Sequence, residues 1–357
     1  MMLSLEIIES KEGVKQFLTT WEMLEISQQS LFYQRALYYQ SYCEYLMPPT
    51  ASPYLLVFSD QGKIVGVFPW VKKRLSRFGI PYYHIGSIHH DHINLSDVLF
   101  DENYLNSISE LFKTFLKMLP FNSSVVMRDL RDDSQFFELL SCLSSKAFEI
   151  ESGESFYIDF NEDVDSVLPK RMVKNVKRLL RKANDTGVVE FKFLSGDEIT
   201  TQAFEDFLVV ESSGWKGQSG TETAITLNPK LKSYYQSFLQ AMPAKMQLSM
   251  FYLNGDPIAA HYCFKDDHCL SLAKVGYIEE HKSLSPSHVL IYQAIQNAGL
   301  IGGGNRISFV TGAGWLGQWY PKSAKLFTIY LPASFLGLVV LTVVKWFKNL
   351  RKIAKKK

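Results

Sequence analysis

The sequence has few cysteines and little net charge, and both features narrow the classes of protein it can be. Its 357 residues include four cysteines, none of them in a Cys-x-x-Cys pair. We therefore expect reduced thiols in a cytoplasmic protein rather than a disulfide framework or a zinc site. The formal net charge of +2 identifies no partner. No secretory signal is expected, because MMLSLEIIESKEG lacks a basic stretch followed by an apolar run.

The composition is that of a packed globular protein. Hydrophobic residues make up 46% of the chain and charged residues 21%, which excludes wholesale disorder. Aromatic residues reach 14%, which favours strands and clefts lined by rings. A chain of this length exceeds what one hydrophobic core usually holds, so we expect two domains.

Two hairpins are predicted, at residues 54–71 and 247–264, where apolar runs flank Asp-Gln-Gly and Asn-Gly-Asp turns. A third strand is predicted at about 269–277. The similar surroundings of both hairpins indicate an internal duplication: two lobes of like topology, each with an antiparallel sheet flanked by helices. We place the lobes at residues 1–165 and 166–331.

Residues 169–185 predict a strongly basic helix that ends before Gly187. Apolar residues at helical spacing give it a partial buried stripe. One interpretation of its basic face is a solvated surface, and the other is a patch that binds the phosphates of a cofactor, lipid or RNA. The basic residues are Lys170, Arg171, Lys174, Lys177, Arg178, Arg181 and Lys182.

A second helix is predicted to start at Ser285-Pro286, after the strand that ends near Tyr277. Ser285 suits an N-cap and Pro286 the first helical position. Unpaired N–H groups and the helix dipole favour a pyrophosphate at such a start. The alternative is a capped helix that binds nothing.

Glu211 projects from the core-facing side of a predicted helix at 203–213. A buried carboxylate must be paired, hydrogen-bonded or raised in pKa. A raised pKa in a cleft suits a general base for an amine nucleophile. The alternative is a strut tied to Lys216, Lys274 or a backbone N–H. Trp215 and Lys216 follow, flanked by glycines, and predict an aromatic platform with one cation.

The run His89-His90-Asp91-His92 invites a metal interpretation, but a strand would offer only two ligands on each face, so we expect no metal. Asp91, His92 and Asp97 more plausibly line a polar pocket for an amine or sugar acceptor. His261 is isolated on a strand and is expected to be structural.

Several motifs together resemble the FemAB-like, CelD-type branch of the GNAT acyltransferases. They are the basic helix, Glu211 with Trp215-Lys216-Gly217, Gly255-Asp256-Pro257-Ile258-Ala259, Lys274-Val275-Gly276-Tyr277, Ser285-Pro286-Ser287, and Gly312 with Trp319. FYQRALYYQSY and GKIVGVFPWV in the first lobe also match. The resemblance covers nearly the whole chain up to about Leu331.

The resemblance implies an α+β (α/β GNAT-like) fold of two tandem lobes, each a mixed, largely antiparallel sheet flanked by helices. It implies acetyl-CoA or a longer acyl-CoA as co-substrate. The implied donor-binding residues are Lys274, Tyr277, Ser285, Pro286, Ser287 and His288, of which His288 departs from the glycine common in the branch. The implied acceptor-binding residues are His92, Asp97, Trp215, Lys216 and Trp319.

The predicted function is N-acyl transfer from acyl-CoA to an amine on a cell-envelope or polysaccharide precursor, directly in a ternary complex. No serine or cysteine lies in a nucleophile-elbow context. Glu211 is the first choice for the base and Asp91 the second. One alternative is an aminoacyl-tRNA-dependent transferase like the sister FemABX enzymes, although tRNA is the less expected partner. The other is a non-catalytic module at the membrane.

The C-terminal residues 332–357 combine an apolar run with a basic end. No charged residue occurs between Leu326 and Val344, and seven basic residues follow from Lys345. KLFTIYL is predicted to be the last strand of the second lobe, and the remaining apolar run is too short to span a bilayer comfortably. We expect a helix in peripheral contact with the inner membrane, with a helix packed on the body as the alternative.

Overall fold

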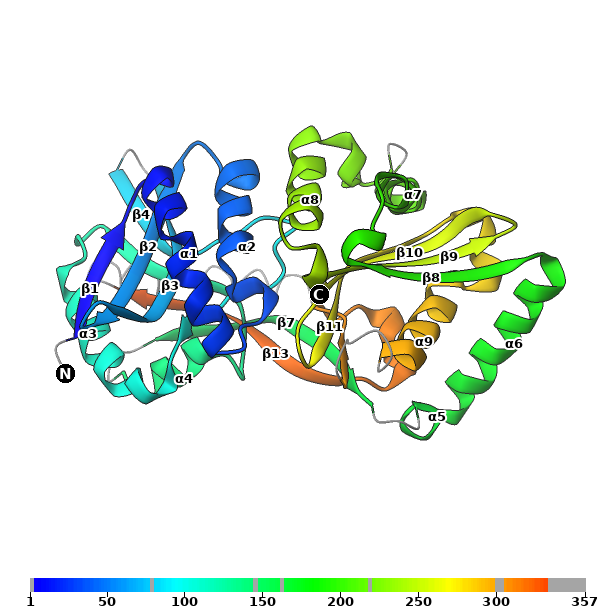
Figure 1. The fold of residues 1–357 in the computed structure, drawn as a ribbon. Helices are drawn as coiled ribbons and strands as arrows, with labels where there is room; N and C mark the ends of the chain where they lie inside the picture. The colour runs from blue at the N-terminus through cyan, green and yellow to red at the C-terminus, as the bar shows by residue number, and fades with distance from the viewer. Residues whose placement is uncertain are drawn as a thin grey trace, which may run out of the picture. The chain divides into compact units, whose positions relative to one another are not determined.

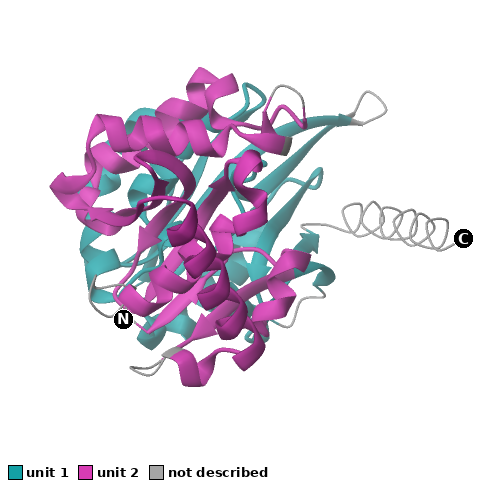
Figure 2. Ribbon diagram, turned by 90° about the vertical axis from the view of Figure 1, so that its right-hand side faces the viewer, with its two compact units in different colours: residues 1–153, 324–357 teal, residues 154–323 magenta. Residues whose placement is uncertain are grey.

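The computed structural model describes residues 3–77, 80–143, 147–160, 164–217, 220–298 and 305–332, apart from the side chains of residues 77, 80, 164, 215 and 298. The chain forms two compact units: unit 1 comprises residues 1–153 and 324–357, and unit 2 residues 154–323 (Figure 2). The predicted C-terminal helix at 333–357 lies outside the described residues. Within the described part, no helix has both the length and the hydropathy needed to cross a membrane.

Unit 1 begins with a strand and four helical segments, which lead into a three-stranded meander (Figure 1). Its strands are β1 (Leu3–Ile8), β2 (Ala51–Asp60), β3 (Lys63–Arg77), β4 (Ile80–Ser87), β5 (Leu99–Phe100) and β6 (Ser123–Arg131). Its helices are α1 (Lys11–Ser27), η1 (Phe32–Gln34), α2 (Ala36–Ser41), η2 (Tyr42–Leu46), η3 (Glu102–Tyr104), α3 (Leu105–Met118) and α4 (Gln135–Ser141).

The sheet of unit 1 follows the order β1-β2-β3-β4-β6-β13, with β5 paired to β3. β13 (Lys322–Pro332) comes from the end of the described chain and pairs antiparallel with β6. The predicted strand KLFTIYL is therefore confirmed as a strand, but its assignment to the second lobe is wrong. The unit boundaries differ from the predicted lobes at two places: residues 324–331 belong to unit 1, and residues 154–165 belong to unit 2.

Unit 2 repeats this order of elements, preceded by helices α5 and α6. Its strands are the end of β7 (Phe148–Asp159), β8 (Val189–Ser195), β9 (Met246–Leu253), β10 (Asp256–Lys265), β11 (Cys269–Tyr277) and β12 (Arg306–Ser308). Its helices are α5 (Val164–Val167), α6 (Lys170–Thr186), η4 (Gly196–Glu198), α7 (Thr201–Glu211), η5 (Gly214–Lys216), η6 (Ile225–Leu227), α8 (Pro229–Ala241), η7 (Pro243–Lys245), η8 (Glu279–Leu284), α9 (Pro286–Ala298) and η9 (Gly314–Trp319).

The two sheets share one topology. Unit 2 has the order β7-β12-β11-β10-β9-β8, in which β11 and β12 are parallel and the other pairs antiparallel. In unit 1 the corresponding parallel pair is β4 and β6. A helix connects each parallel pair, α9 in unit 2 and α3 in unit 1, as a parallel crossover requires. The predicted duplication of a mixed, largely antiparallel sheet flanked by helices is confirmed.

The hairpin predictions are confirmed for a local reason. The β2–β3 turn places Gln61 and Gly62 at φ 49° and 83°, and the β9–β10 turn places Asn254 and Gly255 at φ 54° and 88°. Two successive positive φ angles match the right-handed twist of the strands that they connect. Asparagine and glycine tolerate this region best, which explains why the turns were visible in the sequence.

Each sheet is covered by helices on both faces. In unit 2, side chains of α6 and α9 share one core with β9, β10 and β11, while Phe207 of α7 and Tyr235 of α8 contact Tyr262 on the other face. In unit 1, α3 and α4 pack with Phe68 and Trp70. These buried rings supply most of the specific packing, and they fix where the polar side chains of each unit lie.

Candidate functional site

The start of α9, the predicted pyrophosphate site, follows β11 through the short helix η8. Pro286 is the first residue of α9, as predicted. Ser285 has φ 44° and ψ 57°, in the left-handed region, rather than the extended conformation typical of an N-cap. The Ser285 carbonyl accepts hydrogen bonds from the N–H groups of His288 and Val289, at 3.0 and 3.2 Å.

This geometry leaves few N–H groups for a ligand. A helix start offers four N–H groups without intrahelical partners. Here the Ser285 N–H donates to the Lys282 carbonyl at 3.0 Å, Pro286 has no N–H, and the His288 N–H bonds to Ser285. Within the described chain, Ser287 supplies the remaining N–H of this turn. One donor is a weak cradle for a pyrophosphate.

His288 is held by the tryptophan predicted to bind the acceptor. Trp319 Nε1 donates to His288 Nδ1 at 3.0 Å, and the two rings stack with centroids 5.8 Å apart. Because indole N–H only donates, Nδ1 must be unprotonated in this bond. Burial also lowers the pKa of His288, which favours the neutral ring. Trp319 is 1% exposed, so it forms core rather than a surface for a substrate.

The remaining predicted donor residues lie on both faces of β11. Lys274 Nζ lies 5.9 Å from the Tyr235 ring centroid, on the face that α8 covers. Tyr277 packs on the opposite face, with the core that contains α9, and burial raises its pKa. Ser287 Oγ donates to the Gly276 carbonyl at 3.3 Å. The structure therefore does not gather all of these residues at one point.

Glu211 ends α7 and is 1% exposed. Its Oε1 lies 3.2 Å from Lys216 Nζ, and its Oε2 accepts the Ile225 N–H at 2.9 Å. Lys216 also donates to the Val275 carbonyl of β11 at 2.9 Å. These contacts correspond to the strut that the sequence left open beside the general base. Glu211 anchors η5 and η6 to the sheet. The Trp215 side chain lies outside the described residues.

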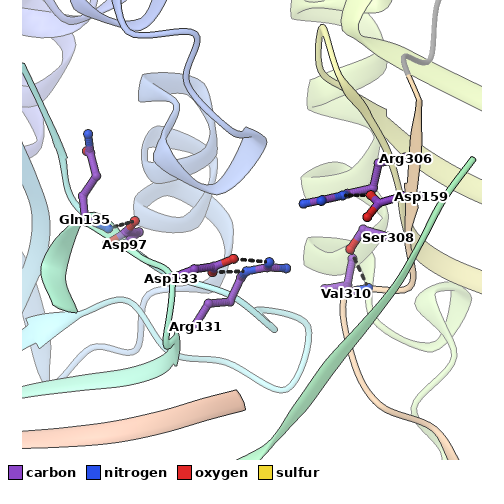
Figure 3. A network of polar contacts seen from close by, with 8 residues as sticks. All are labelled: Asp97, Arg131, Asp133, Gln135, Asp159, Arg306, Ser308 and Val310. Carbon is purple, nitrogen blue, oxygen red and sulfur yellow. Dashed lines mark hydrogen bonds and ion pairs between the residues drawn. The ribbon is translucent and has the colours of Figure 1, made fainter. Parts of the chain in front are cut away.

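The predicted acceptor pocket in unit 1 is not assembled as expected. Asp91 is exposed in the turn between His90 and Ile93, whereas Asp97 is 3% exposed. Asp97 accepts N–H groups of Gln135 and Phe136 at the start of α4 (Figure 3). Burial raises the pKa of Asp97 to about 7. Its oxygens are used within the fold, so it positions α4.

His92 completes this group of predicted residues. Its backbone N–H donates to His90 Nδ1 at 3.1 Å, and the residue is 9% exposed. A search of the described residues finds no group of three or more ligands suited to a metal.

A cluster of exposed charge in unit 2 lies on α6, which is confirmed as a helix from Lys170 to Thr186. Met172, Val176 and Leu179 are buried, and all seven basic side chains are exposed. A groove of about 410 Å³ runs along one face of this helix. Its lining residues are Asp165, Lys170, Val173, Lys174, Lys177 and Arg181.

Asp165 is a site residue that the sequence analysis missed. It pairs with Lys177 across the groove and accepts the Tyr292 hydroxyl at 2.7 Å. These contacts lower the pKa of Asp165 and hold the Lys177 side chain in place. Lys170, Lys174, Lys177 and Arg181 follow helical spacing on one face. That spacing was the available signal, but the partners from α5 and α9 were not visible locally.

A second set of polar contacts that the sequence analysis missed lies where β7 ends and β12 begins. Asp159 on β7 pairs with Arg306 at 2.6 Å (Figure 3) and also with Lys322 at 2.9 Å. The Arg306 guanidinium lies over the Tyr157 ring, 4.2 Å from its centroid. Because about 150 positions separate these residues in the chain, no local pattern reveals the pairing. The cluster connects β7 to β12.

Comparison with known proteins identifies the fold. Residues 170–314 match the family model for an acetyltransferase (GNAT) domain. No curated protein matches the chain. Among solved structures, FemX is 10% identical with a TM-score of 0.57, over 92% of this chain and 97% of that chain.

Two further solved structures are similar to this chain over nearly its full length. The C-terminal domain of a putative lysylphosphatidylglycerol synthetase from Agrobacterium fabrum has a TM-score of 0.56 at 9% identity, covering 93% of this chain and 96% of its own. L-PGS from Bacillus licheniformis has a TM-score of 0.55 at 10% identity, covering 92% and 96%. The architecture is thus the GNAT acyltransferase fold. The resemblance to the CelD-type branch in particular stays a prediction.

Proposed function

We propose that this protein is an aminoacyltransferase that takes its aminoacyl group from a charged tRNA and passes it to an amine on an envelope or lipid precursor. The observation that carries the proposal is the exposed basic row of α6 with its open groove. Regularly spaced Lys and Arg side chains match the phosphates of a nucleic-acid backbone. The tRNA-dependent alternative, which was the less expected one from the sequence, thereby replaces acyl-CoA as the leading interpretation.

The start of α9 supports the same choice. Acyl-CoA carries a pyrophosphate, which this fold is expected to receive at that helix start. Ser285 and Pro286 leave one N–H for it, and His288 is stacked on Trp319. An aminoacyl-tRNA does not require a pyrophosphate site at this helix start, because its phosphates are spread along the RNA and can be bound elsewhere.

The fold neighbours agree with this donor. The FemABX enzymes, which use aminoacyl-tRNA, are sisters of the branch that the sequence resembles, and the structural match to FemX covers 92% of the chain. The name lysylphosphatidylglycerol synthetase describes an amino acid joined to a lipid. These likenesses support the fold directly and the donor by analogy.

The proposed chemistry is direct aminolysis of an ester. The acceptor nitrogen attacks the aminoacyl carbonyl, the C–N bond forms, the ester C–O bond breaks, and the terminal ribose hydroxyl of the tRNA leaves with a proton. The protein accelerates this by orienting donor and acceptor together. Glu211 contributes as a positioning residue, because both of its oxygens are engaged with Lys216 and Ile225.

The first test compares two faces of α6. The variant Lys174→Gln/Lys177→Gln/Arg181→Gln removes three groove cations. We expect tRNA affinity at low salt to fall by about 100-fold and the dependence of log K on log salt to become shallower by about three. The matched control Arg171→Gln/Arg178→Gln/Lys182→Gln removes three cations from the adjacent face of the same helix. Equal losses in both variants would contradict a specific groove.

The second test addresses the other candidate, acyl-CoA, which the match of the GNAT model across β11 and α9 favours. Calorimetric titrations with acetyl-CoA and with aminoacyl-tRNA distinguish the donors. We expect heat and saturation with the RNA alone. Saturable binding of acetyl-CoA without binding of tRNA would reject the tRNA donor and restore the acyl-CoA interpretation.

A further inference from the structure

Unit 1 carries a basic and aromatic arm at the end of its longest hairpin. β3 has 15 residues, and its last part pairs with β4 from Trp70–Ser87 to Arg77–Ile80. Lys73 and Arg74 are exposed there, on the two opposite faces of the hairpin, and pair in register with His84 and Tyr83.

An exposed apolar pair lies beside this arm. Met118 at the end of α3 is 77% exposed and Phe121 is 68% exposed. Asn122 fixes them to β4: its side chain donates to the Pro81 carbonyl and its carbonyl accepts the Tyr83 N–H, both at 2.9 Å. Lys117 adds a further exposed cation. We call Lys73, Arg74, Lys117, Met118 and Phe121 the arm surface.

The described chain ends at the same edge. Pro332 of β13 is opposite Ser124 of β6, and Ser124 in turn is opposite His84 of β4. The segment 333–357 therefore departs within two strands of the arm. Its sequence is uncharged up to Val344 and then carries seven basic residues.

We propose that the arm surface docks on a membrane that contains anionic phospholipids. Lys73, Arg74 and Lys117 would contact the lipid phosphates, while Met118 and Phe121 enter the interface below them. Exposed Met and Phe side chains beside cations match the boundary between headgroups and acyl chains. An RNA partner would bind the cations but would leave the exposed Met118 side chain without an apolar contact. The docking is independent of the donor proposed above.

The test measures how the full-length protein partitions onto vesicles of phosphatidylcholine with and without phosphatidylglycerol. Lys73→Gln/Arg74→Gln removes two cations, each expected to contribute about fivefold to binding of an anionic surface. We expect binding to the anionic vesicles to fall by roughly 25-fold. Met118→Ser/Phe121→Ser is expected to weaken binding about tenfold, in the anionic vesicles and in the neutral ones.

Matched controls come from the same unit. Lys63→Gln removes an exposed cation at the opposite end of β3, and Met23→Ser/Ile26→Ser removes two exposed apolar side chains from α1. Neither is expected to change partitioning by more than twofold. If the arm variants bind vesicles as the wild type does, the segment 333–357 acts alone and the proposal is overturned.

A second readout locates the contact. In a Cys142→Ser background, an environment-sensitive dye on Phe121→Cys is expected to shift its emission to the blue when vesicles are added, and a dye on Met23→Cys is not. Loss of tRNA binding instead of vesicle binding in Lys73→Gln/Arg74→Gln would assign the arm to RNA and reject the membrane. Retained tRNA binding with lost vesicle binding separates this proposal from that of the donor.

Discussion

Units 1 and 2 have the same order of strands and helices but different additions. Unit 1 lengthens its central hairpin: β3 has 15 residues, where its counterpart β10 has 10. Unit 2 has α6 before its first full strand, whereas the described part of unit 1 begins directly with β1. The shared part is scaffold, since it buries the apolar side chains. The basic row of α6 lies on one addition, and the arm surface combines the lengthened part of β3 with the end of the shared helix α3.

The units also differ in how they accommodate buried polar groups. In unit 1, Asp97 is bonded to N–H groups of Gln34, Gln135 and Phe136, which are neutral donors. In unit 2, Glu211 is bonded to an ammonium group, and the nitrogens of His261 have no hydrogen-bond partner among the described residues. Neutral donors compensate a buried charge less than a counter-ion does. The first three predictions that follow test this difference, and the fourth compares packing in the two units.

The largest expected effect concerns the buried ion pair of unit 2. Lys216→Met leaves Glu211 charged and buried without its cation, which we expect to lower the free energy of unfolding by about 3–5 kcal/mol. Lys72→Met in unit 1 breaks a half-exposed pair with Glu9 and is expected to cost under about 1 kcal/mol. Urea denaturation measures both. Similar small losses would show that burial does not distinguish the pairs.

His261 predicts acid sensitivity in unit 2. Burial lowers its pKa to about 3, from 6.5. Above pH 6.5 the ring is neutral in both states, and below it the unfolded state alone takes up the proton. The free energy of unfolding therefore falls as pH drops from 6.5, by about 1.4 kcal/mol per unit at most. His261→Gln is expected to remove this slope in denaturation measured from pH 7 to 4.5.

Asp97 predicts the opposite slope in unit 1. Its pKa rises to about 7, so below pH 4 the carboxyl is protonated in both states. Between pH 4 and 7 the unfolded state releases the proton first, and the free energy of unfolding falls as pH rises, by a few kcal/mol at most. Asp97→Asn is expected to flatten this dependence. A dependence that persists in the variant would place its origin elsewhere.

The smallest expected effect tests packing in two strand glycines. A Cβ on Gly276 of β11 would lie 3.1 Å from both Glu211 Cα and the Val210 carbonyl oxygen. Gly276→Ala is therefore expected to cost about 1–3 kcal/mol by crowding. Gly153→Ala on β7 meets nothing within 4 Å and is expected to change stability by less than about 0.5 kcal/mol. Thermal denaturation of both variants gives the comparison.

Local features were predictable, and contacts between distant segments were not. The hairpin turns at Gln61–Gly62 and Asn254–Gly255, the amphipathic α6 and the start of α9 at Pro286 all follow from short-range rules. The burial of Trp319 does not follow from such rules, because its partner His288 lies 31 positions away. Nor does the left-handed backbone of Ser285, which depends on how η8 joins α9.

The sequence by itself determined the duplicated order of elements, since strand and helix periodicities and turn residues act within a few positions of each other. The tertiary structure alone decided that β13 returns to unit 1, and that Glu211 is a strut bonded to Lys216 and Ile225, one of the alternatives that the sequence left open. The first depends on strands that lie far apart in the chain, and the second on the burial that the folded unit imposes on Glu211, which requires a partner for its carboxylate.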